Sequence, residues 1–255
     1  MKNSIIRLLV FLHIDKLPFI PQKLILRIKE LRDIFSSWNK MPGESKISMV
    51  KFDKYWNQKK IQIALDDFKN QHNRNNLRFY AYAMMFAKEI DNYENILDFG
   101  AGTGNHSHMM SKNFPRKNFA CYDIAYHIPR VFDAFSNSMT TRQVRYYSSL
   151  ENALKPGQLV YSNLVFSHLS GYQLENYLKI FRDNGSDLLV FANTLIDQNR
   201  NTHKSRMRIN NIGLFDHNYR RFISDYGYNI KWLYQIKDPL LKDKDMTILY
   251  ATLSD

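Results

Sequence analysis

Residues 95–104 constrain the fold of this 255-residue chain more than any other stretch. In the sequence Asn-Ile-Leu-Asp-Phe-Gly-Ala-Gly-Thr-Gly, apolar residues typical of a buried strand lead to a carboxylate, Asp98, and then to a turn. The glycines of that turn let the backbone bend tightly and approach a ligand without intervening side chains; they are Gly100, Gly102 and Gly104. The stretch therefore predicts a strand that ends in a binding turn for a nucleotide-like cofactor.

Strand-like and helical segments alternate along the chain after this turn. Short apolar runs predict strands at 119–122, 144–147, 159–162, 188–192, 230–235 and 247–252. Helical spacing predicts helices at 128–135, 172–181 and 218–225, and upstream at about 54–70 and 76–90. Such alternation is typical of an α/β fold, with a mostly parallel sheet and helices on both faces.

The formal net charge of +12 is concentrated near the N-terminus. Residues 1–60 hold 13 Lys and Arg against 5 Asp and Glu, and apolar residues from Leu24 to Phe35 repeat at helical spacing between basic ones. This pattern is typical of a helix that docks on a membrane surface or a partner protein, and equally of one packed on the main domain with a solvated basic face. Met41-Pro42-Gly43 breaks this pattern and is a candidate boundary. We expect an N-terminal basic helical extension over 1–75 and a main domain over 76–255.

Cys121 is the single cysteine, which excludes an intrachain disulfide and a cysteine-based zinc site. The apolar run from Ile5 to Ile14 is too short to span a bilayer and is interrupted by Arg7 and His13. We therefore expect a cytoplasmic protein, or one bound peripherally at the inner membrane face through its basic helix. No set of His, Asp and Glu has metal-ligand spacing, so no metal site is predicted.

Three classes of ligand compete for the glycine turn. A phosphate-binding P-loop is excluded because Gly104 is followed by Asn105 and His106 instead of Lys and Ser or Thr. The spacing G-x-G-x-G differs from the dinucleotide fingerprint, and Asp98 would repel a pyrophosphate. A cofactor with positive charge and no phosphate, such as S-adenosylmethionine, fits better. The next strand ends in Asp123, 19 residues past Gly104, where an acid in nucleotide-binding α/β sheets accepts both ribose hydroxyls.

The glycine turn with its leading Asp98, followed by Asp123, resembles the motifs of the class I S-adenosylmethionine-dependent methyltransferases. The resemblance covers about residues 76–252 and implies a Rossmann-like seven-stranded sheet whose final hairpin is reversed. It implies that Asp98 and the turn hold the methionine part of S-adenosyl-L-methionine, and that Asp123 holds the ribose. Ile124, the next residue, is also expected to bind the cofactor. The turn residues implied in this contact are Gly100, Ala101, Gly102 and Gly104.

Two further cofactor contacts are expected. One lies after the third strand, where this chain departs from the family, and the other lies at the end of the fourth strand. Many members carry an acid for the adenine amino group after the third strand, whereas this chain has Tyr146-Tyr147-Ser148-Ser149-Leu150. Ser148 or a backbone carbonyl is the expected substitute. Asn163 ends the fourth strand, in the segment that lies beside the methyl group in similar methyltransferases.

Histidines are the candidates for catalysis on the acceptor side. His168 occupies a position that often faces the active-site cleft in similar enzymes, and an imidazole suits the base that a hydroxyl acceptor needs. Packing within its loop is the alternative. His217, in the pair Asp216-His217, is a second candidate, while His106 and His108 are expected beside the cofactor or on the surface. An Asn-Pro-Pro-Tyr motif is absent, which disfavours methylation of adenine or glutamine amino groups.

The polar segment 193–204, with the nearby Arg206 and Arg208, suits a carbohydrate or phosphorylated acceptor, and a solvated loop is the alternative. We therefore predict O-methylation of a glycan or nucleotide-sugar by in-line methyl transfer. Two other functions remain open. An RNA methyltransferase fits the basic charge, although no RNA-binding module is recognisable. A non-catalytic scaffold or binding protein with the same fold fits the missing adenine-contact acid.

Overall fold

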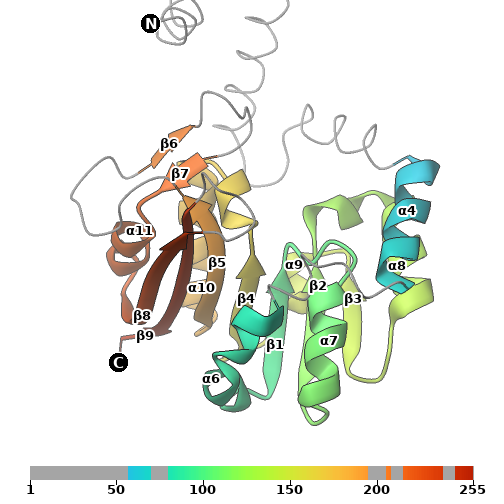
Figure 1. Cartoon of the computed structure of the whole chain (residues 1–255), viewed down its shortest axis with the longest axis horizontal. Coiled ribbons are helices and arrows are strands. Elements are labelled where there is room, and N and C mark those ends of the chain that lie inside the picture. The colour runs from blue at the N-terminus through green and yellow to red at the C-terminus, as the bar shows by residue number, and fades with distance from the viewer. Residues whose placement is uncertain (1–56, 70–79, 195–204, 208–214, 238–244, 255) are drawn as a thin grey trace, which may run out of the picture.

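The computed structural model describes residues 57–69, 80–194, 205–207, 215–237 and 245–254, and its centre is a seven-stranded sheet. The strands are β1 (Asn95–Phe99), β2 (Asn118–Tyr122), β3 (Val144–Tyr147), β4 (Leu159–Asn163), β5 (Asp187–Thr194), β8 (Tyr228–Lys237) and β9 (Asp245–Leu253). They lie in the order β3-β2-β1-β4-β5-β9-β8 (Figure 1). Two short strands, β6 (Ser205–Met207) and β7 (Phe215–His217), form a separate antiparallel pair.

The direction of strand order reverses between β1 and β4. Strands β3, β2, β1, β4 and β5 are parallel, whereas β9 runs antiparallel to both β5 and β8. In open parallel sheets, ligands bind at such a reversal, beyond the carboxyl ends of the strands. The predicted Rossmann-like sheet with a reversed final hairpin is confirmed.

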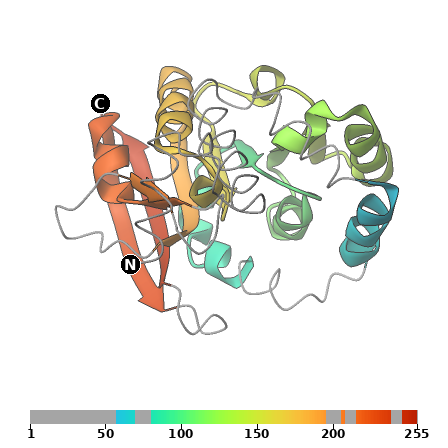
Figure 2. The same cartoon turned by 90° about the horizontal axis from the view of Figure 1, so that it is seen from above.

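Helices cover both faces of the sheet (Figure 2). One face carries α4 (Gln58–Lys69), α6 (Ala87–Asp91), α7 (Asn105–Asn113) and α8 (Pro129–Met139). The other face carries α9 (Leu150–Ala153), α10 (Gly171–Asp183) and α11 (Tyr219–Asp225). Two short 3-10 turns follow the carboxyl ends of β2 and β4, namely η2 (Ile124–His127) and η3 (Phe166–His168).

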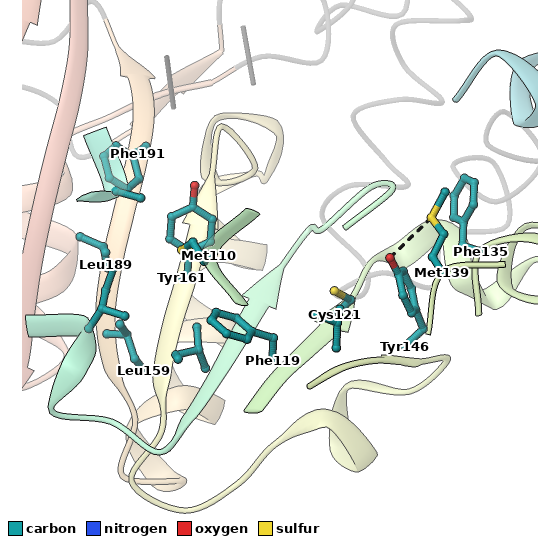
Figure 3. Close-up of a cluster of buried hydrophobic side chains, with 14 of the residues drawn as sticks. Met110, Phe119, Cys121, Phe135, Met139, Tyr146, Leu159, Tyr161, Leu189 and Phe191 are labelled. Atoms are coloured by element: carbon teal, nitrogen blue, oxygen red, sulfur yellow. Dashed lines mark hydrogen bonds between the residues drawn. The ribbon is translucent and has the colours of Figure 1, made fainter. Parts of the chain in front are cut away.

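Alternating side chains divide the core into two layers. In β1, Ile96 packs in the cluster beneath α7 and α8, whereas Leu97 packs in the cluster beneath α10. Figure 3 shows the first cluster, with Phe119 and Cys121 from β2 and Tyr161 from β4. The apolar runs that predict strands are continuous because both faces of a parallel sheet are buried.

Local sequence signals start the helices α10 and α11. The helix α10 begins with a capping box, in which Ser170 Oγ accepts from Gln173 N at 3.3 Å and Gln173 Oε1 accepts from Ser170 N at 2.9 Å. At α11, Asn218 Oδ1 accepts from Arg221 N at 3.1 Å. These caps fix where the chain turns back after β4 and after β7.

Parts of the chain differ from the sequence prediction or lie outside the described residues. The helix expected at 76–90 begins outside the described residues, is described from 80 on, and is interrupted by a turn at Met85, which leaves this apolar residue 66% exposed instead of facing the core. The helix α9 and the β6–β7 pair were too short for the apolar pattern to predict. Residues 1–56, with the expected basic helix, and residues 195–204 are outside the described part. Within that part, no helix has the length and apolar character needed to cross a membrane.

Candidate cofactor and active site

The glycine turn follows the carboxyl end of β1 and is bonded to the neighbouring strand. Gly100 N and Ala101 N both donate to the carbonyl oxygen of Tyr122, at 2.7 and 3.0 Å. Gly100, Gly102 and Gly104 have φ angles of 78°, 55° and 75°, in the left-handed region that favours glycine. The path of the turn is therefore set by hydrogen bonds to β2 and by a backbone conformation that other residues rarely adopt.

The three glycines differ in their surroundings. A Cβ atom at Gly100 would overlap the side chain of Val165, and one at Gly104 would overlap Tyr146 Oη. A Cβ atom at Gly102 would meet no atom of the described residues within 4 Å. Packing of the protein itself therefore requires glycine at the first and last positions, whereas Gly102 borders space that no described residue fills.

Asp123 lies directly after β2, and its carboxylate reaches back to the glycine turn. Its Oδ2 accepts from Gly102 N at 3.0 Å, and its Oδ1 accepts from Ala125 N at 2.8 Å. Burial raises the pKa of this carboxyl group, and the two backbone hydrogen bonds oppose the rise. Because a carboxylate oxygen has two lone pairs, each oxygen keeps an acceptor position for a ligand hydroxyl.

Asp98 is buried on β1, with 2% of its surface exposed. Ser107 on α7 donates from Oγ to Asp98 Oδ2 at 2.8 Å. Burial raises the pKa of Asp98 to about 7, the charge of Asp123 adds to the rise, and the hydrogen bonds from Ser107 oppose it. A cationic group bound beside these two acids would favour the ionised form of Asp98.

Two tyrosines hold the carbonyl oxygens of the glycine turn. Tyr126 Oη donates to Gly102 O at 2.5 Å, and Tyr146 Oη donates to Thr103 O at 2.9 Å. Figure 3 shows Tyr146 on β3 with its hydroxyl directed at Met139, whose sulfur lies 3.6 Å away. Sequence reasoning missed both tyrosines, because neither belongs to a motif and only the sheet order brings them to the turn.

The end of β4 lies beside the start of α7. Asn163 Nδ2 and His106 Nδ1 are 3.4 Å apart, and the His106 ring lies edge-on to Tyr161 with centroids 6.0 Å apart. Burial lowers the pKa of His106 to about 4, so its imidazole is neutral at physiological pH. Leu164 follows with a φ of 63°, a strained conformation of the kind that clusters at functional sites. The structure thus brings His106, expected only near the cofactor, to the end of the fourth strand.

Several buried polar atoms near this edge have no hydrogen-bond partner among the described residues. They are Asn105 Oδ1, Asn163 Oδ1 and Tyr161 Oη. An unpaired buried polar atom costs about 1–3 kcal/mol, which favours a ligand or water that bonds to it. Amide oxygens and carboxylates suit an ammonium group, and Asp123 suits a ribose, so the residues present fit S-adenosylmethionine.

Solved methyltransferase structures share this architecture. The glycopeptide N-methyltransferase MtfA aligns with a TM-score of 0.52 at 11% identity, over 68% of this chain and 95% of that chain. Human N-acetylserotonin methyltransferase, in complex with S-adenosylmethionine, aligns with a TM-score of 0.55 at 13% identity, over 89% of this chain and 66% of that chain. The chain has the class I methyltransferase fold. No protein-family model matches its sequence, and no curated protein does either.

The methyltransferase fold places the two candidate bases in different surroundings. His168 is the last residue of η3, in the loop after β4, and is exposed. His217 on β7 is fully buried, and its Nε2 donates to Leu169 O at 2.9 Å. Its ring packs against Phe215, Tyr219 and Phe222. The bond to Leu169 joins the β6–β7 pair to the loop after β4.

The remaining predicted positions lie around the same edge of the methyltransferase fold. Ser148 is exposed in the turn after β3, and Ile124 is half-buried at the start of η2. Most of the polar segment 193–204 lies outside the described residues. Among the residues that the structure describes, no group of three or more His, Cys, Asp and Glu is arranged to hold a metal ion.

Proposed function

We propose that this protein is an S-adenosylmethionine-dependent methyltransferase. The observation that carries the proposal is the carboxylate of Asp123, 3.0 Å from the amide of Gly102 at the reversal of strand order. An acid at this point is placed to hold a ribose, and Gly102 borders the space in which the rest of a cofactor would lie. The methyltransferase fold supports the same conclusion.

Different residues of the chain hold different parts of the cofactor. Asp123 accepts hydrogen bonds from the ribose hydroxyls, beside Ile124. Asp98 and the amide oxygen of Asn105 favour the ammonium of the methionine part, since both are buried at the same edge. When bound, S-adenosylmethionine supplies a methyl group that its sulfonium already activates. Asp98 and Asp123 together repel a pyrophosphate, so this site is expected to bind S-adenosylmethionine in preference to a dinucleotide.

Alignment of the acceptor is the main task left to the protein, because the methyl group needs little further activation. Asn163 and His106 lie together at the end of β4, and the neutral imidazole can accept a hydrogen bond from an acceptor hydroxyl. The lowered pKa makes His106 a weak base, so we assign proton removal to the exposed His168 on the adjacent loop. We assign His217 the positioning of the β6–β7 pair.

We further propose that the acceptor is the oxygen of a carbohydrate, either a glycan or a nucleotide-sugar. The polar composition of residues 193–204, after β5, supports this class because amide and carboxylate side chains bond sugar hydroxyls. The basic pattern of the 1–75 extension supports docking on an anionic membrane surface or a partner protein, and a cytoplasmic location at the inner membrane face.

Two measurements test the methyltransferase activity and the acceptor class separately. Methylation itself is tested by incubating the full chain with radiolabelled S-adenosylmethionine and an extract of cells that lack the gene, with Asp123→Ala as the inactive control. Label transfer by the wild-type chain alone supports a methyltransferase, whereas equal transfer by both chains contradicts it.

The acceptor class is tested by comparing the carbohydrates of the deleted and parental cells by mass spectrometry. We expect one sugar to lose a methyl increment in the deleted cells, and His168→Ala to fail to restore it. Unchanged carbohydrates, with label in RNA instead, would overturn the carbohydrate acceptor and favour the RNA methyltransferase. Absence of both label transfer and cofactor binding would favour the non-catalytic scaffold.

A further inference from the structure

A pocket of about 210 Å³ opens at the edge of the sheet opposite the glycine turn. Asn118 is the first residue of β2, Gln143 precedes β3 and Gln158 precedes β4, and all three line the pocket. The pocket therefore lies at the amino ends of the parallel strands, whereas the proposed cofactor edge lies at their carboxyl ends.

Three cationic side chains line this pocket, namely Arg142, Arg145 and Lys155. No Asp or Glu lines it, and in the described part of the chain none of the three cations forms an ion pair. Clustered charges of one sign repel each other and raise the local concentration of counter-ions. The pocket is therefore electrostatically suited to an anion.

Gln158 adds a buried hydrogen-bond donor to these charges. It is 1% exposed, and its Oε1 accepts from Lys155 N at 3.1 Å, which fixes the orientation of the amide. Its Nε2 is buried and has no hydrogen-bond partner among the described residues. A buried donor of this kind is usually matched by a ligand or a water molecule, and an anion supplies the acceptor that is missing.

The pocket exists because the sheet is thinly covered at this point. On the α10 face, the helix that lies over β2 and β3 is α9, which has only four residues. Arg145 on β3 is exposed and pairs in register with Ala120 on β2, whose small side chain lines the pocket. The Arg145 guanidinium is thus accessible without any rearrangement of the core.

We propose that this pocket binds a phosphate group. Two guanidinium groups and an ammonium supply positive charge and forked hydrogen-bond donors, which suit a phosphate, and the buried amide of Gln158 supplies a further donor. Pockets that enclose drug-sized ligands measure roughly 300–1,000 Å³. This one is smaller, so it takes a single phosphate, either free or at the end of a sugar phosphate whose remainder stays in solvent. The site is separate from methyl transfer at the opposite edge.

Titration calorimetry on the full chain tests this proposal, with inorganic phosphate and a sugar phosphate in separate runs at an ionic strength held constant with chloride. We expect Arg145→Gln to weaken phosphate binding at least tenfold. Arg221→Gln removes the same charge from an exposed position on α11, outside the pocket, and is the matched control, with an expected change of less than twofold. Gln158→Glu keeps the oxygen that accepts from Lys155 N but replaces the donor with an anion, so it should abolish binding.

The outcomes are distinct. Tighter binding of the sugar phosphate supports an esterified ligand, and equal affinities support the free anion. Equal weakening by Arg145→Gln and Arg221→Gln overturns the site, because it would reflect net charge alone. Binding of an RNA oligonucleotide without binding of either phosphate also overturns it. S-adenosylhomocysteine binding by Arg145→Gln should match the wild type, so failure of this proposal is distinguishable from failure of the methyltransferase assignment.

Discussion

The carboxyl edge of the sheet has two halves that are built in different ways. Over β1 and β2, backbone amides of the glycine turn bond to Tyr122 O and to the Asp123 carboxylate. Over β4 and β5, side chains from separate segments set the shape, and His217 attaches the β6–β7 pair to the loop after β4 through Leu169. The first half is therefore encoded in a short motif, and the second depends on contacts between distant parts of the chain.

The largest expected effect is in the first half, on replacing Asp123 with Ala. Loss of two hydrogen bonds to a charged group, each worth about 1.5–3 kcal/mol, should weaken S-adenosylhomocysteine binding by roughly 100-fold or more. Asp133→Ala removes an exposed carboxylate from α8 and is the control. A competition assay against a fluorescent cofactor analogue measures both variants, and less than a threefold difference between them would remove Asp123 from the cofactor site.

Replacing His217 with Ala tests the second half. The change removes a fully buried ring and its bond to Leu169 O, and we expect the free energy of unfolding to fall by about 2–4 kcal/mol. His168→Ala removes an exposed imidazole and should change stability by less than about 0.5 kcal/mol. Urea denaturation compares the two, and equal losses would show that β6–β7 does not depend on His217.

Within the first half, Gly102 and Gly104 are expected to differ in their effects on stability and on cofactor binding. Gly104→Ala forces a side chain against Tyr146, and we expect it to lose about 1–3 kcal/mol of stability. Gly102→Ala meets no described atom and should lose only about 1 kcal/mol through its positive φ, yet weaken S-adenosylhomocysteine binding at least ~10-fold because the methyl group enters the ligand's space. Thermal unfolding and S-adenosylhomocysteine binding are measured for both variants. Weaker binding by Gly104→Ala than by Gly102→Ala would place the cofactor elsewhere.

The pH dependence of cofactor binding gives the smallest expected effect. The pKa of Asp98 is raised from 3.8 to about 7, and a bound ammonium lowers it again. Affinity for S-adenosylhomocysteine should therefore rise between pH 6 and pH 8, by up to about tenfold per pH unit below the free pKa. Asp98→Asn should flatten this dependence, whereas a wild-type profile retained in that variant would exclude Asp98 as its source.

The same group affects the stability of the free protein in the opposite direction. Because folding raises the pKa of Asp98, the folded chain binds its proton more tightly than the unfolded chain. The contribution of this group to stability is therefore fully present below about pH 4 and is lost as the pH rises through about 7. Asp98→Asn should remove this loss in thermal unfolding scans across that range.

The difference between the two halves also explains what the sequence could predict. The glycine turn, Asp98 and Asp123 are readable because each strand end carries its own chemical signal. The apolar runs likewise predict the strands of the sheet, since burial on both faces leaves few polar interruptions. The proximity of His106 to Asn163 depends on the crossover between β1 and β4, and the burial of His217 depends on a strand of three residues. Neither this proximity nor the burial of His217 produces a pattern that can be recognised in the sequence.

Titration calorimetry with S-adenosylhomocysteine and with NAD, each on the full wild-type chain at pH 8, tests the central claim most directly. We predict one-to-one binding of S-adenosylhomocysteine with a Kd in the ~1 μM–1 mM range of enzyme ligands, and no binding of NAD. No heat at millimolar S-adenosylhomocysteine, or tighter binding of NAD, would contradict the assignment of this edge to a phosphate-free sulfonium cofactor.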